Sequence, residues 1–131
     1  MTAWDTRRED VEPSANAVLT TEDAVRQAPN NAAAKMLRAR ALVLRGDYAR
    51  AQTDLDELVR NFPKTAAVHA QMGDLHLARQ NRAAARRSFE QALALDPNLF
   101  EALRGRIFLD LLDGKPDQAK LMAERQLEQS P

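Results

Sequence analysis

Four prolines recur at one fixed interval, and this constrains the fold more than any other feature of the chain. They are Pro29, Pro63, Pro97 and Pro131, each thirty-four residues after the one before. Because proline lacks a backbone N–H and clashes with the preceding helical turn, each of them is expected to end a helix. A constant period of this length is typical of stacked helical hairpins, each of which buries its apolar face only against its neighbours.

Residues 66–97 show the contents of one period most clearly. Apolar or small residues recur with helical spacing on both sides of a polar break at residues 79–82. The first set is Met72, Gly73 and His76, and the second is Ala85, Phe89, Ala92 and Leu93. The pattern predicts two helices joined by a tight turn. Few glycines, few aromatic residues and abundant Ala, Leu and Arg favour helix throughout, so the predicted class is all-α.

The preceding period predicts helices over Ala32–Arg45 and Tyr48–Asn61. Gly46 suits the left-handed conformation that ends the first of them, and Asp47 suits the N-cap of the second. A hairpin of two antiparallel helices is therefore expected here as well.

The turns of the next two periods fall at the same place. Gln80 stands one period after Gly46, and because glutamine tolerates a left-handed backbone poorly, we expect this turn to be the least ideal. In the last period, Gly114 occupies the turn position equivalent to Gly46 and Gln80, and Pro116 suits the first turn of the last helix.

Small residues mark the predicted closest contacts between helices. Gly73 and Ala85 are expected where the two helices of the middle hairpin approach each other, with Phe89 filling the space beside them. Ala51, Ala85 and Ala119 lie one period apart and are predicted to occupy equivalent environments.

In these residues the chain resembles the tetratricopeptide-repeat (TPR) family. The family pattern places a large residue, Leu-Gly and an aromatic on the first helix, then Ala, an aromatic and Ala on the second, then Pro. The middle unit carries the pattern at His69, Met72, Gly73, His76, Ala85, Phe89, Ala92 and Pro97. The unit before it carries the pattern at Lys35, Arg38, Ala39, Leu42, Gly46, Asp47, Tyr48, Ala51, Leu55, Leu58 and Pro63. The unit after it carries the pattern at Leu103, Ile107, Leu111, Gly114, Ala119 and Pro131.

The resemblance covers residues 32–131 and implies a right-handed α-solenoid of stacked antiparallel hairpins, with three repeats and an N-terminal capping helix. The predicted organisation is a flexible tail over residues 1–13 and a TPR-like domain over residues 14–131. Within that domain we expect a capping helix over residues 14–28 and repeats over residues 32–65, 66–99 and 100–131.

Composition narrows the classes of function. The chain has 19 Lys and Arg against 19 Asp and Glu, so bulk charge does not favour a nucleic acid or an acidic membrane as partner. It has no cysteine, which excludes disulfides and thiolate chemistry. No apolar run reaches membrane length and no leader is visible, so we expect a cytoplasmic protein, or a periplasmic one if a leader has been removed.

Candidate catalytic and metal sites are sparse. His69 and His76 lie on one helical face, but seven residues apart, whereas zinc-binding pairs are usually spaced by about three to five. We expect both in interhelical packing. The acidic cluster at Asp54, Asp56 and Glu57 lacks the glycine turn of a calcium loop and is expected to be a solvated helix face. No nucleophile elbow or phosphate loop is present, so we expect no enzyme, no metal and no cofactor.

Arg79, Arg82, Arg86 and Arg87 form a basic run across the middle turn. The alternatives are contact with RNA or a phosphopeptide, and a solvated helix with pairs such as Arg86–Glu90. We favour the second, and an RNA-binding helical repeat remains the alternative function.

The family resemblance implies a non-catalytic scaffold that binds a peptide or a partner helix in a concave groove lined by the first helix of each hairpin. The groove positions carried over are Met36, Leu37, Arg40, Val43, Leu44, Gln71, Asp74, Leu77, Ala78, Arg104, Phe108, Leu111 and Leu112. A family subclass grips a terminal carboxylate with a Lys/Asn clamp, but Met36 and Asp74 stand at the clamp positions, so we expect no such clamp here. Arg40 and Arg104 are the cations left to meet an acid on the ligand.

Two further expectations concern partners. The last helix, from Pro116 to Gln129, presents apolar residues with no following helix, which predicts further repeats or a homo-oligomer. The sequence LRARALVLRGDYARA in residues 37–51 is similar to repeats of bacterial exopolysaccharide-export and envelope-assembly TPR proteins, so a role in a bacterial assembly or export system is expected.

Overall fold

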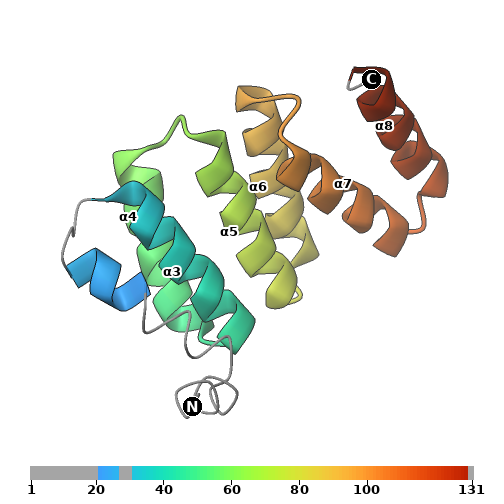
Figure 1. The fold of residues 1–131 in the computed structure, drawn as a ribbon. Helices are drawn as coiled ribbons and strands as arrows, with labels where there is room; N and C mark the ends of the chain where they lie inside the picture. Colours follow the sequence, from blue (N-terminus) through green and yellow to red (C-terminus); the bar gives the residue numbers. More distant parts are fainter. Residues whose placement is uncertain (1–20, 27–30, 130–131) are drawn as a thin grey trace, which may run out of the picture. The chain divides into compact units, whose positions relative to one another are not determined.

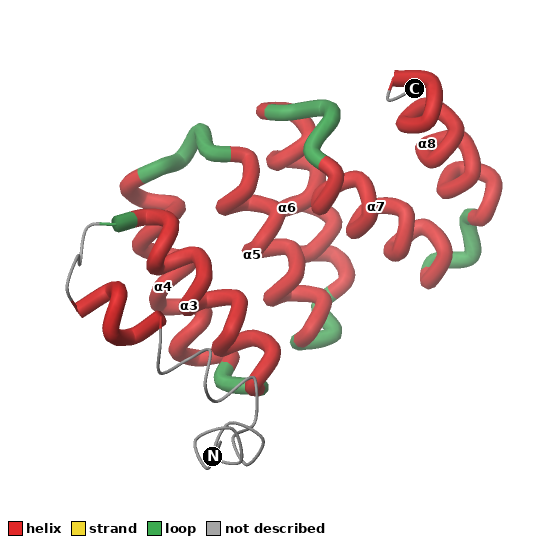
Figure 2. Tube along the Cα trace, viewed as in Figure 1, coloured by secondary structure: helices red, strands yellow, loops and turns green. Residues whose placement is uncertain are grey.

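The computed structural model describes residues 21–26 and 31–129, and all the regular elements in those residues are α-helices (Figures 1 and 2). The chain divides into two compact units, Met1–Leu58 and Val59–Pro131. The predicted tail and most of the predicted capping helix lie outside the described residues, while residues 21–26 are helical. Within the described residues, no helix is long and apolar enough to cross a membrane.

The first unit contains α3 (Ala32–Arg45) and most of α4 (Tyr48–Asn61), with the bounds that the sequence predicts. Small and branched side chains line the inside of this hairpin. Ala39, Ala51 and Leu55 are completely buried and Leu42 almost so, and two charged residues, Lys35 and Asp54, are buried beside them.

The second unit contains four helices, which are α5 (Ala66–Ala78), α6 (Arg82–Leu95), α7 (Phe100–Leu112) and α8 (Pro116–Gln129). Each of these helices packs against the next along the chain, and α5 also contacts α7 (Figure 1). The core of this unit is formed by Ala70, Ala85, Phe89, Ala92, Ala102 and Leu109.

The three turns that close the hairpins share one backbone conformation. Gly46, Gln80 and Gly114 have φ angles of 89°, 62° and 72°. The backbone N–H of the following residue donates back to the preceding helix in each case, from Asp47 to the carbonyl of Leu42 at 2.9 Å, for example. A left-handed backbone suits glycine and strains a residue with a Cβ, so Gln80 adopts the conformation that glutamine is expected to tolerate poorly.

The predicted start signals of the helices are present in the structure. Asp47 accepts from the backbone N–H of Arg50 at 3.4 Å, and Asn81 accepts from that of Ala84 at 3.2 Å. Pro116 is the first residue of α8. These contacts satisfy backbone N–H groups that have no partner inside their own helix.

Phe89 on α6 fits between two glycines on neighbouring helices. A Cβ added to Gly73 on α5 would lie 2.6 Å from the Phe89 ring, and one added to Gly105 on α7 would lie 2.3 Å from it. The contact at Gly73 confirms the prediction for this position. The contact at Gly105 was not predicted, although a glycine inside a helical pattern often has such a packing reason.

The repeating register is visible in the small residues as well. Ala51 and Ala85 are completely buried, and Ala119 is 3% exposed. The three alanines that the sequence predicts to be equivalent are therefore alike in burial.

Candidate functional site

Among the predicted groove positions, the α7 helix carries the largest number of exposed apolar side chains. Arg104, Phe108, Leu111 and Leu112 recur at helical spacing and therefore share one face. Phe108 is 50% exposed, Leu111 55% and Leu112 41%. Arg104 is exposed and has no ion-pair partner among the described residues. This face thus combines apolar side chains with an available positive charge.

Phe100 extends this face and was missed by sequence reasoning. It is the first residue of α7, lies four residues before Arg104, and is 62% exposed. The spacing of Phe100, Arg104 and Phe108 is the signal that could have found it.

The predicted positions on α5, which contacts α7, are less accessible. Asp74, Leu77 and Ala78 are half-buried, and Leu77 packs against the core of the second unit. Gln71 is 9% exposed, and its buried Oε1 has no hydrogen-bond partner within the described part of the chain. The α5 positions therefore contribute less contact surface than those on α7.

In the first unit, α3 presents its own set of predicted positions. Leu37 and Leu44 are 57% and 75% exposed, Arg40 is exposed, and Met36 and Val43 are half-buried. Arg40, like Arg104, has no ion-pair partner in the portion of the chain that is described. The chemistry of the α7 face, with exposed leucines beside an arginine, thus occurs on α3 as well.

Ion pairs from α6 to α7 and its C-terminal end engage two of the four arginines of the predicted basic run, Arg82 and Arg86. Arg86 donates to Asp110 at 2.8 Å and to Asp113 at 2.7 Å, and Arg82 approaches Asp113 at 3.5 Å. The expected Arg86–Glu90 pair was wrong, because the side chain of Arg86 reaches across to α7, and Glu90 pairs with Arg106 at 3.3 Å.

These contacts shift the pKa values of Arg86 and Asp113. The hydrogen bond to Asp110, followed by the one to Asp113, raises the pKa of the Arg86 guanidinium above its ordinary value. The hydrogen bond from Arg86 lowers the pKa of the Asp113 carboxyl below its ordinary value. Arginines engaged with carboxylates in this way are less available to an RNA phosphate.

Interior ion pairs also join the helices of the first unit. Lys35 Nζ lies 2.6 Å from Glu57, and Arg38 forms two hydrogen bonds to Asp54, at 2.7 and 2.5 Å. Hydrogen bonding to Asp54 raises the pKa of Arg38. The prediction of a solvated acidic face was therefore wrong for Asp54, which is 4% exposed, because its partner lies on the other helix of the hairpin.

The two histidines occur where packing was predicted. His69 is buried, and its Nε2 donates to the carbonyl of Pro63 at 2.7 Å. Among the described residues, no group of three or more His, Cys, Asp or Glu side chains gathers in a way that could hold a metal ion.

Two sequence profiles match the chain, and both describe the tetratricopeptide repeat. The first covers residues 14–75 and the second residues 66–99. Their overlap includes much of α5, the first helix of the middle hairpin. No curated protein sequence matches the chain.

Solved structures with the same fold include two bacterial proteins. MamA (residues 41 to the end) from Desulfovibrio magneticus RS-1 is 17% identical with a TM-score of 0.71, and the match covers 88% of this chain and 65% of that one. TTC0263, a thermophilic TPR protein in Thermus thermophilus, is 17% identical with a TM-score of 0.78, and the coverage is again 88% and 65%.

A third similar structure is the Cut9–Hcn1 hetero-tetramer of the APC/C, at 22% identity and a TM-score of 0.69, covering 83% of this chain and 21% of that one. The chain thus spans about two thirds or less of the similar structures. At these identities the matches show the fold, which is an all-helical TPR-like solenoid. The two profile matches, together with the repeated turns, show that the chain belongs to the tetratricopeptide-repeat family, whose repeats form protein–protein interaction scaffolds.

Proposed function

We propose that the chain binds a peptide or a partner helix through the exposed face of the first helix of each hairpin, and that the α7 face provides the main anchor contacts. The observation that carries this proposal is the exposure of Phe108, Leu111 and Leu112, at 50%, 55% and 41%, beside an arginine with no ion-pair partner among the described residues. Large apolar side chains exposed together are typical of binding surfaces.

The chemistry of these faces defines the ligand. Phe100, Phe108 and the two leucines offer aromatic and aliphatic contacts along about three turns of helix, which suits an amphipathic helix or an extended segment with spaced apolar anchors. Arg104 and, in the first unit, Arg40 would each pair with an acidic group of the ligand. Such charges at the edge of a contact mainly steer the partner and select its register.

A pull-down from an extract of the source cell tests this proposal. The chain and its Phe108→Ala variant serve as baits, and bound proteins are quantified by mass spectrometry. We expect at least one partner to be lost with the variant, because truncating a central aromatic contact weakens binding about tenfold or more. Calorimetry with that partner then measures the loss.

Phe62→Ala is the matched control, because Phe62 is 39% exposed and belongs to the loop between α4 and α5 instead of to α7. We expect it to retain every partner. Partners that bind equally well to the parent and to a Phe108→Ala, Arg104→Ala double variant would contradict the proposal.

The finer biological setting is also a proposal. The similarity of residues 37–51 to repeats of bacterial export and envelope-assembly proteins supports a partner within such an assembly. The identity of the proteins recovered in the pull-down tests this setting directly.

Self-association through α8 is proposed as a further use of the scaffold. Leu121 and Leu127 on α8 are 49% and 73% exposed, and large apolar residues exposed on one helix favour contact with another protein chain, here a second copy. Analytical ultracentrifugation of the chain and of a Leu121→Gln, Leu127→Gln variant tests this. A monomeric parent at high concentration would contradict it.

A further inference from the structure

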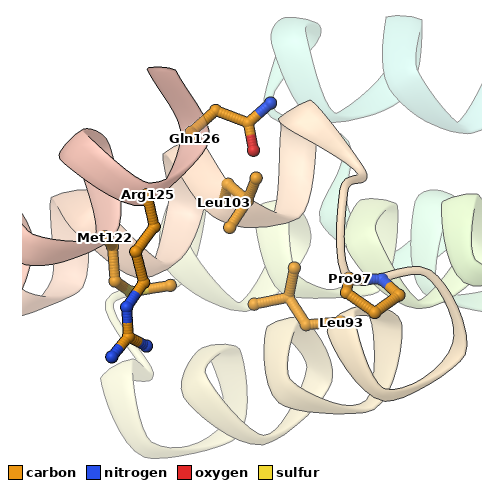
Figure 3. Close-up of a pocket in the computed structure, with 6 residues that line it drawn as sticks. All are labelled: Leu93, Pro97, Leu103, Met122, Arg125 and Gln126. Atoms are coloured by element: carbon orange, nitrogen blue, oxygen red, sulfur yellow. The ribbon is translucent and has the colours of Figure 1, made fainter. Parts of the chain in front are cut away.

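A pocket of about 220 Å³ opens in the second unit, where α6, α7 and α8 meet. It is lined by Leu93, Pro97, Leu103, Met122, Arg125 and Gln126. Figure 3 shows Leu93 and Pro97 on one side, Met122 and Arg125 on the other, and Leu103 between them. None of these residues belongs to the predicted groove positions, so the pocket is distinct from the proposed groove contacts.

The side chain at Leu103 makes one wall of the pocket apolar. One period earlier the corresponding residue is His69, which is buried and donates to the carbonyl of Pro63, the residue that corresponds to Pro97. Leu103 has no polar group with which to make this bond. Leu93, Leu103 and Pro97 therefore form an apolar wall where the preceding repeat has a hydrogen-bonded histidine.

The size of the pocket limits what can occupy it. A cavity of about 150 Å³ accommodates a benzene molecule, whereas sites for drug-sized ligands usually measure roughly 300–1,000 Å³. The pocket of about 220 Å³ is therefore suited to one large apolar side chain. A leucine, isoleucine, methionine or phenylalanine side chain is of this size.

Arg125 supplies the charge beside this apolar wall. It is exposed and has no ion-pair partner among the described residues. By contrast, Arg82, Arg86 and Arg106 in the same unit all pair with carboxylates of α6 or of α7 and its C-terminal end. A guanidinium without a partner, next to an apolar recess, is complementary to a ligand that carries an acid close to an apolar group.

We propose that this pocket binds a linear peptide segment of a partner protein, in which one large apolar side chain fills the space between Leu93, Leu103 and Met122 and a neighbouring carboxylate pairs with Arg125. The site would give the scaffold a second docking point, independent of the α7 face. Two weak contacts on one scaffold raise the overall affinity for a partner that reaches both.

Selection from a display library of short random peptides tests the proposal. The full chain is the target, and enriched peptides are measured by fluorescence anisotropy against the parent and single variants. We expect a class of peptides that pair an apolar residue with Asp or Glu. Their affinity should fall about tenfold with Arg125→Glu, because a charge-assisted contact becomes repulsive.

Arg87→Glu is the matched control, since it makes the same charge change at an exposed arginine of α6 that belongs neither to the pocket nor to the α7 face. It should leave the affinity of this peptide class within about twofold. Met122→Trp, which fills the pocket without a charge change, should also weaken binding, and a thermal melt shows whether this variant is folded.

Three outcomes would overturn the proposal. The first is that no acidic-apolar peptide class is enriched. The second is that Arg125→Glu and Arg87→Glu reduce the affinity equally, which would indicate unspecific attraction by net charge. The third is a concentration-dependent dimer of the parent that Arg125→Glu converts to a monomer, which would assign the pocket to a second copy of the chain.

Discussion

The α3–α4 hairpin and the α5–α6–α7 region are both built from antiparallel helices with the same turn conformation, but equivalent positions between their helices carry different side chains. Between α3 and α4, the ion pairs Lys35–Glu57 and Arg38–Asp54 cross the hairpin. In the second region, the ring of Phe89 fills the space between Gly73 and Gly105. Moving Arg38 and Asp54 forward by one period gives Met72 and Ser88, so the same positions have exchanged charge for neutral side chains.

This comparison shows that the repeat period of the backbone does not determine which side chains fill the space between the helices. Left-handed residues at positions 46, 80 and 114 keep every turn alike. What lies between the helices then varies, provided that shape and hydrogen bonding are satisfied. Interior ion pairs of this kind do not by themselves make a hairpin more stable than well-packed neutral residues, because desolvation offsets their attraction.

The largest effect is expected from Phe89→Ala. Phe89 is completely buried and contacts glycines on two other helices, so its removal leaves a cavity in the core of the second unit. We expect a loss of roughly 3–5 kcal/mol in the free energy of unfolding, measured with chemical denaturant. Phe108→Ala, at a half-exposed position, serves as control and should change stability by no more than about 0.5 kcal/mol.

The next largest effect on stability is expected in the α3–α4 hairpin. Arg38→Met leaves the buried carboxylate of Asp54 without its main partner, and since Arg38 is partly exposed, we expect a loss of about 2–3 kcal/mol. The double variant Arg38→Met, Asp54→Ser reproduces the chemistry of Met72 and Ser88. It should recover most of the loss. A double variant as unstable as the single one would show that the two interiors are not interchangeable.

A smaller, stabilising effect is expected at the middle turn. Gln80 is exposed and has a φ of 62°, a conformation that costs a residue with a Cβ about 1–2 kcal/mol relative to glycine. Replacing Gln80 by glycine removes this cost, but part of the gain in stability is offset because glycine loses more backbone entropy on folding. Gln80→Gly should therefore raise the free energy of unfolding by up to about 1 kcal/mol. An unchanged or lower melting temperature would contradict the assignment of strain to this turn.

The smallest effect is pH-dependent. Because the hydrogen bond from Arg86 lowers the pKa of Asp113 in the folded state, this carboxyl stabilises the fold at pH values above its unfolded pKa, which is about 3.9. The contribution is lost as the pH falls through the lower, folded pKa. Melting curves between neutral pH and about pH 2 should therefore show a shallower acid-induced decline for Asp113→Asn than for the parent.

Asp56→Asn provides the comparison for this experiment. Asp56 is exposed and accepts a hydrogen bond from the neutral amide of Gln52 at 2.8 Å. Its replacement should leave the acid-induced decline nearly as steep as in the parent. Identical curves for both variants would mean that the Arg86 contact does not stabilise the folded state.

The parts of the fold that follow local rules were predictable from the sequence. The helix bounds of α3 and α4 and the turn at Gly46 and Asp47 are confirmed, because capping and glycine preferences depend on residues only a few positions apart. The left-handed backbone at Gln80 follows from the same local rules, and the strain in this turn stays a prediction.

Contacts between helices were less predictable. The Arg86–Asp110 and Arg38–Asp54 pairs join residues 24 and 16 positions apart, and which side chains meet depends on the stacking register. Helical spacing within one element could not reveal either pair. The groove positions were carried over from the family resemblance, and their role in binding stays a prediction, although the exposed face of α7 supports it.

The buried carboxylate of Asp110 has a consequence for how this sequence can evolve. Asp110 is completely buried. Its Oδ1 accepts a hydrogen bond from Arg86 on α6 and lies 3.8 Å from Nε of Arg106 on α7. A lineage that exchanged Asp110 for a neutral residue would remove the carboxylate that both guanidinium groups approach, and one that lost Arg86 first would leave this buried carboxylate with only the longer contact to Arg106. Positions 86 and 110 are therefore expected to change together in descendants, as a linked pair spanning the second and third hairpins.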